Sequence, residues 1–222
     1  MLILMVSSAA ISGQERDTDF QVRNETVIQI PVVKGVDREK KEIDKLSVLV
    51  FGNLRFGQNR LYLTDARIGA GFDYRINRHL SFSPTYLYSR SETVRNSKAY
   101  EHRVRFDLTV GNKWKHFSLR DRNRVEYRSR NSRSDSVRYR NRLTLSVPVI
   151  IDKKEVFAPY ISNEVYYDFT EKKFTTNEFI AGISRKLSKN VSTDIFYLRR
   201  NFRDSNFSHW NGIGVNFKIR SD

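Results

Sequence analysis

Arginine recurs at every second position in two neighbouring stretches of the chain. The arginines are Arg120, Arg122, Arg124, Arg128, Arg138, Arg140 and Arg142, and Glu126 occupies one position of the same spacing. A guanidinium group binds a carboxylate or another oxyanion through paired hydrogen bonds, so a face with several arginines could hold acidic side chains or an anionic ligand. Successive side chains of a strand point to opposite faces, whereas a helix would spread residues at this spacing round its circumference. The spacing therefore predicts two strands that share one cationic face.

Apolar residues keep the same alternation from Leu46 to Ile219. We expect ten strands there, at about residues 46–56, 67–75, 80–89, 101–110, 117–130, 137–147, 160–169, 178–187, 191–200 and 212–219. No stretch has a helical period, no Gly- or Pro-rich linker divides the chain, and no later window is long and apolar enough for a transmembrane helix. The chain is therefore expected to be all-β.

The length of the strands and the charges on one face favour a membrane barrel over a soluble sandwich. Soluble strands are most often about five or six residues long, whereas a tilted transmembrane strand needs about 9–11. A charged face repeated on successive strands is typical of a polar lumen. Aromatic residues near strand ends fit two interfacial girdles; they are Tyr74, Tyr86, Tyr88, Trp114, Phe117, Tyr127, Tyr139, Tyr160, Trp210 and Phe217. We predict a closed antiparallel up-and-down transmembrane β-barrel of about 10–12 strands in the bacterial outer membrane.

The composition leaves one rival class open. A net charge of +15 with 39% apolar residues would also fit a soluble basic protein that binds nucleic acid. Such a protein would need aromatic residues on its cationic face for base stacking, and the arginine face lacks them. No nucleic-acid partner is therefore expected. The absence of cysteine excludes disulfides and thiolate metal sites.

The N-terminal region divides into a leader and a segment before the barrel. Residues 1–13 combine an apolar run, Leu2 to Val6, with small residues up to Gly13, which resembles a secretory signal peptide without its basic start. We expect cleavage after Gly13. Residues 14–45 then form an N-terminal strand at about 20–33 and a charged connector, and residues 46–222 form the barrel. Ten strands close with both ends in the periplasm, so segment 20–33 could be a periplasmic strand, a plug or part of a twelve-strand set.

Connection lengths predict the orientation of the barrel. Short turns are expected at about 77–79, 112–113, 152–154 and 188–190, and longer polar loops at about 57–64, 90–98, 129–136, 170–176 and 203–208. Outer-membrane barrels place short turns in the periplasm and long loops outside the cell. The longer set is therefore expected to be extracellular, where its basic residues could contact lipopolysaccharide.

The order of the arginine motifs resembles the DUF2490 family of bacterial outer-membrane barrels. The matching runs are Arg120–Arg128 (RDRNRVEYR), Arg138–Leu143 (RYRNRL) and Pro159–Glu164 (PYISNE). The resemblance covers nearly the whole chain after the leader and implies a barrel fold, but the family has no agreed activity or catalytic residues. Where the family pattern has Asn-Arg, this chain has Asn177-Glu178, which inverts one lumenal charge.

The charged face has a structural and a functional interpretation. The expected lumenal charge network comprises Glu101, Arg103, Arg105, Asp107, Arg120, Arg122, Arg124, Glu126, Arg128, Arg138, Arg140, Arg142, Glu164 and Asp168. The lumen of a barrel of about ten strands is narrow, so arginines paired with acids would plug it and hold the strands in register. The acids are fewer than the arginines, so a small anion-selective pore is the alternative.

No catalytic site is expected. The four histidines lack metal-ligand spacing, and a lipid-modifying enzyme would need a Ser/His pair at one depth, for which His102 and Ser118 are candidates. We therefore expect no enzyme activity, no cofactor and no metal. The expected partners are outer-membrane lipid, lipopolysaccharide and the barrel-assembly machinery.

Overall fold

The computed structural model describes residues 17–37, 40–57, 62–94, 97–152, 154–203 and 207–221. The expected signal peptide, residues 1–13, lies outside these ranges. Twelve strands follow one another: β1 Asp17–Val36, β2 Glu42–Gly57, β3 Tyr62–Arg75, β4 Leu80–Val94, β5 Ser97–Lys113, β6 Ser118–Arg130, β7 Ser136–Ser146, β8 Val149–Ile151, β9 Lys154–Asp168, β10 Lys173–Lys186, β11 Val191–Phe202 and β12 Phe207–Arg220. Nowhere in the described ranges is there a helix long and apolar enough to cross a membrane.

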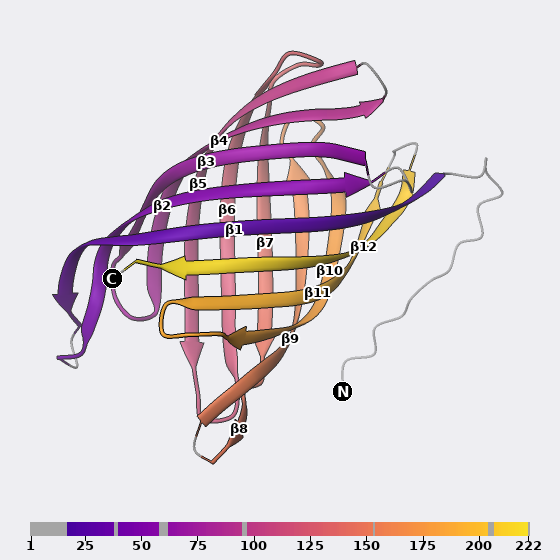
Figure 1. The fold of residues 1–222 in the computed structure, drawn as a ribbon. Coiled ribbons are helices and arrows are strands. Elements are labelled where there is room, and N and C mark those ends of the chain that lie inside the picture. The colour runs from indigo at the N-terminus through magenta and orange to yellow at the C-terminus, as the bar shows by residue number, and fades with distance from the viewer. Residues whose placement is uncertain are drawn as a thin grey trace.

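The strands close into one barrel (Figure 1). Each strand pairs antiparallel with its neighbours along the chain, and β7 pairs with β9 across the short β8. Strand β8 pairs with β9 only among the described strands, and this hairpin projects beyond the wall in Figure 1. The barrel wall therefore has eleven strands, and the predicted all-β closed barrel is confirmed.

Strand β1 completes the wall, which corrects the division of the chain at residue 46. It pairs antiparallel with β2 and parallel with β12, from Asp17 opposite Phe207 to Gln29 opposite Arg220. With eleven strands that alternate in direction, the first and last run the same way, so the seam must be parallel. The expectation of an even strand number is therefore wrong. Segment 20–33 is neither a plug nor a separate periplasmic strand.

Alternation along each strand separates an apolar outer wall from a polar lumen. Ile161 and Ile195 are 50% and 61% exposed, whereas Glu126 and Glu164 are 0% and 1% exposed. The apolar residues thus cover the outside and the charged residues fill the inside, the reverse of a soluble core. Two residues of the expected aromatic girdles depart from this plan: Tyr160 lines the lumen, and Trp210 lies close to the lumenal Arg200.

Glycines make room for the large residues of the lumen. Phe196 of β11 lies opposite Gly182 of β10 and Gly214 of β12, and a Cβ atom at either glycine would approach Phe196 to within 2.7 Å or less. Phe196, Leu198 and Ile180 form a small buried apolar cluster there. The sequence does not decide which face of β11 carries Phe196 and Leu198, because apolar residues stand at consecutive positions there. In the structure both side chains point into the lumen.

Apart from the β8 hairpin, the connections at the two ends of the barrel are of similar length. One end, here called the His79 end, carries the turns after β1, β3, β5 and β10 and the β7–β9 connection with its β8 hairpin, and the other, the Asp135 end, carries the turns after β2, β4, β6, β9 and β11. Residues expected in long loops belong to strands, since β6 extends to Arg130 and β3 begins at Tyr62. The difference in length between turns and loops, from which we predicted the orientation of the barrel in the membrane, is therefore small. The orientation stays a prediction.

Candidate functional site

Glu164 of β9 is the point at which three arginines of the lumen converge. It accepts hydrogen bonds from Arg122 at 2.8 Å, from Nε of Arg140 at 2.9 Å and from Nε of Arg142 at 2.9 Å. These donors come from β6 and β7, so one carboxylate joins three strands of the wall. A buried charge is tolerated when it is paired and fully hydrogen-bonded, as Glu164 is.

Glu178 of β10 is a second such point. Nε of Arg200 donates to it at 2.7 Å, Arg23 at 3.0 Å and Arg142 at 3.1 Å. Arg142 therefore bridges Glu164 and Glu178 and links β7 to β1 and β11 through them. The inverted charge at Asn177-Glu178 is thus matched by three arginines, two of which, Arg23 and Arg200, lie outside the predicted network.

Tyr166 lies at the centre of this cluster and is 2% exposed. Its hydroxyl accepts hydrogen bonds from Arg140 at 2.9 Å and from Arg200 at 3.2 Å. The guanidinium carbons of Arg140 and Arg138 lie 4.3 and 5.1 Å from its ring centroid, so the ring also stabilises cations by its π face. The alternation indicates this lumenal position, since Tyr166 shares the inward parity of Glu164.

The other predicted acids pair in smaller groups nearer the Asp135 end or on neighbouring strands. The pairs are Glu126 with Arg138 (2.7 Å) and Arg140 (3.5 Å), Asp107 with Arg124 (two contacts of 2.6 Å), and Glu101 with Arg103 (2.7 Å) and Arg128 (3.1 Å). Each pair joins adjacent strands or residues of one strand. Arg124 thus pairs with an acid of β5 and not with Glu126 or Glu164.

Asp65 of β3 adds a group that the sequence analysis did not single out. Nε of Arg67 donates to it at 2.9 Å, the Ser89 hydroxyl donates at 2.9 Å, and Arg55 lies 4.0 Å away. Asp65 follows a segment expected to be loop, which hid its inward parity. With this group, ion pairs line the lumen on both sides of the β1–β12 seam.

Three predicted network residues have other surroundings. Nε of Arg105 donates to the Thr85 hydroxyl at 3.1 Å, and its guanidinium lies 4.6 Å from the centroid of Phe51. Asp168 accepts from the backbone N–H of Thr170 at 2.9 Å and so holds the turn after β9. The side chain of Arg120 makes no hydrogen bond or ion pair with another described residue and lines a cavity instead.

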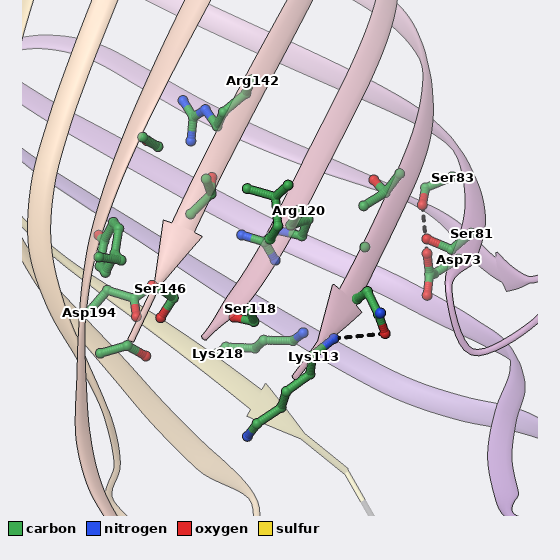
Figure 2. Close-up of a pocket in the computed structure, with 18 of the residues that line it drawn as sticks. Asp73, Ser81, Ser83, Lys113, Ser118, Arg120, Arg142, Ser146, Asp194 and Lys218 are labelled. Atoms are coloured by element: carbon green, nitrogen blue, oxygen red, sulfur yellow. Dashed lines mark hydrogen bonds between the residues drawn. The ribbon is translucent and has the colours of Figure 1, made fainter. Parts of the chain in front are cut away.

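That cavity has a volume of about 1250 Å³ and opens at the His79 end of the lumen (Figure 2). Its deep wall includes Arg142 and Ile180. None of Glu101, Arg103, Glu126 and Arg128 lines it. The lumen thus has a cavity at the His79 end, and buried ion pairs lie further towards the Asp135 end.

The two residues considered for catalysis lie far apart along the barrel. His102 contacts the hydroxyl of Tyr86 at 2.5 Å and pairs with Ser129, whereas Ser118 pairs with Lys113 at the opposite end of the same strand pair. The structure therefore does not bring them together. Within the described ranges, no three His, Asp or Glu side chains are grouped to hold a metal.

A closed β-sheet with an apolar outer wall and a charged lumen defines a membrane β-barrel. The chain belongs to the DUF2490 family, described as "Protein of unknown function", whose model matches residues 16–211. The predicted family is thus confirmed. A comparison with curated protein sequences found no match.

Three solved structures are similar to this chain. They are LpxR from Salmonella typhimurium (11% identity, TM-score 0.44, 75% of this chain and 80% of that chain), a NanC porin (14%, 0.46, 84% and 90%) and an anion-selective porin from Comamonas acidovorans (16%, 0.40, 82% and 56%).

Replacement of Glu126 by Gln is expected to lower stability moderately. Arg138 would lose its hydrogen-bonded carboxylate, whereas Arg140 would keep Glu164 and Tyr166. An under-satisfied buried donor costs about 1–3 kcal/mol, more for a charged group. The temperature at which the heat-modifiable gel band shifts should fall in Glu126→Gln. An unchanged transition would show that Glu126 does not stabilise the barrel.

Proposed function

We propose that this protein is an outer-membrane β-barrel whose lumen is closed by the charge network, so that it serves as a structural barrel rather than an open channel. The observation that carries the proposal is the burial of Glu126, Glu164, Arg103 and Arg128, which are between 0% and 7% exposed. Side chains so poorly accessible to water support a lumen without a continuous aqueous path past them. The ion pairs between strands then act as a plug that also fixes the register.

The membrane location is supported by the outer wall. Ile68, Phe106, Ile183 and Ile213 are each close to half exposed or more, and a soluble protein rarely leaves so large an apolar surface in water. Lipid would cover this wall, and the lumen would satisfy the polar groups. Lipopolysaccharide and the barrel-assembly machinery remain the expected partners of such a barrel.

An anion-selective pore is the second candidate. Among the described residues, the cavity at the His79 end is lined by two acids, Asp73 and Asp194, and by a larger set of cations, namely Arg75, Arg78, Lys113, Arg120, Arg142 and Lys218. An excess of cations along a pore favours anions. These cations, however, line a cavity at one end of the lumen. The buried ion pairs towards the Asp135 end favour the closed barrel.

Solute efflux from liposomes tests the proposal. Purified protein reconstituted into liposomes should release trapped chloride or small sugars no faster than protein-free liposomes. Heat-modifiable mobility of the same sample would establish that folded barrels are present. Rapid release of anions that exceeds release of cations of equal size would instead favour the pore.

A further inference from the structure

Cations without a partner meet in the cavity at the His79 end. Arg120 projects from β6 and Lys218 from β12, and Figure 2 shows both side chains directed into the cavity. The charges of Arg120 and Arg75 act on Lys218, as do those of the two acids discussed below. Within the part of the chain that the structure describes, no hydrogen bond or ion pair involves any of these three side chains. Elsewhere in the lumen nearly every predicted arginine pairs with an acid, so this group is an exception.

Hydroxyl groups surround these cations. The cavity is lined by Thr109, Ser118, Thr144, Ser146, Ser162, Ser184 and Ser192. Hydroxyls donate readily to oxyanions and turn to suit the ligand. Ser118 lies two residues from Arg120 on the same face of β6, so both groups could donate to one ligand. The cavity therefore brings the ammonium group of Lys218, the guanidinium group of Arg120 and rotatable hydroxyl donors together.

The two acids of the cavity do not neutralise this group. Asp73 accepts a hydrogen bond from the Ser83 hydroxyl at 2.6 Å and is held against β4. Asp194 lies near Arg120 and Tyr160 without an ion pair to a described residue. Both carboxylates therefore keep their negative charge, and both act on Lys218, but three cations without an ion pair face them, so the balance in the cavity stays positive.

We propose that this cavity binds a small solute through an oxyanion, either phosphate or carboxylate, held between Arg120 and Lys218. Two like charges brought together from opposite walls repel each other, and an anion between them removes that cost while making charge-assisted hydrogen bonds. The barrel wall separates the site from lipid, so the ligand enters from the aqueous side at the His79 end. A phospholipid headgroup that reaches over the rim has the same chemistry and is the other source. The site does not depend on whether the lumen is closed at the Asp135 end.

Calorimetric titration of the purified barrel in a non-ionic detergent tests the site, with inorganic phosphate as one probe and citrate as the other. Saturable binding of at least one probe is expected for the wild-type protein. Arg120→Gln with Lys218→Gln should weaken it about tenfold or more, since each charge-assisted contact contributes about that factor. Asp194→Asn should tighten it. Arg133→Gln removes the same charge in the connection at the Asp135 end and should leave affinity unchanged.

Several results would overturn the proposal. It fails if neither probe saturates, or if the double variant binds as the wild type does. It also fails if Arg133→Gln weakens binding as much as the double variant, because binding would then reflect net charge alone. Heat-modifiable mobility keeps the test valid by showing that each variant is folded. Repetition in micelles doped with phosphatidic acid distinguishes the sources: unchanged phosphate affinity supports a free solute, and competition by the lipid supports a headgroup.

Discussion

Replacement of Glu164 by Gln is expected to destabilise the barrel more than any other single change in the lumen. Arg122, Arg140 and Arg142 all donate to this carboxylate, and it is 1% exposed. Glutamine has the same shape but no charge. Three buried guanidinium groups would therefore lose the negative charge that offsets the cost of burying them. Loss of one partner of a buried ion pair costs about 3–5 kcal/mol. Urea unfolding in lipid vesicles, followed by tryptophan fluorescence, would measure the change in the free energy of unfolding.

Glu155→Gln is the matched control. Glu155 also receives a hydrogen bond from a cation, Lys113, at 2.9 Å, but both side chains are substantially exposed. An exposed ion pair contributes about 0–1 kcal/mol. Equal losses in the two variants would mean that the effect reflects charge removal in general, and the role assigned to Glu164 would be wrong.

Replacement of Gly71 by Ala is expected to give the second large effect. A Cβ atom at Gly71 would lie 2.3 Å from the carbonyl oxygen of Pro84 and 2.6 Å from the Cα atom of Thr85. Both contacts are with the backbone of β4, which a side-chain rotation cannot relieve. The β3–β4 pair would have to separate locally, and overpacking of this kind costs about 1–3 kcal/mol, occasionally more. The heat-modifiable transition should therefore shift to a lower temperature.

Gly52→Ala separates this steric effect from a general intolerance of alanine. The nearest atom to a Cβ at Gly52 is the carbonyl oxygen of Arg67 at 3.8 Å, an ordinary contact. Its transition should stay close to that of the wild type. A comparable loss in both variants would contradict the close approach of β3 and β4.

The faces of the strands were predictable because period 2 is a local property of the chain. The parity of Arg124, Glu126, Arg140 and Glu164 assigns them to the lumen, and all four are buried there. The same reasoning could not identify partners, because pairing depends on which strands lie side by side and how far each side chain reaches. Arg124 illustrates this limit, since it turns to Asp107 rather than to Glu164.

The closure of the barrel and the shape of the cavity could not be predicted from the sequence, for a different reason. Whether β1 joins the wall depends on contacts with β12, almost two hundred residues away, and no local pattern encodes them. Arg120 has the same parity as Arg122, yet one lines the cavity and the other pairs with Glu164. The difference follows from depth in the lumen, which depends on the register and tilt of the strands.

Planar-bilayer recording of the wild-type protein beside Glu126→Gln tests most directly whether paired charges close the lumen. We predict no steady conductance from inserted wild-type barrels, and a lower unfolding temperature for the variant measured in parallel. Steady anion-selective currents from the wild type, with greater anion preference and unchanged stability in Glu126→Gln, would contradict the closed barrel and establish a pore.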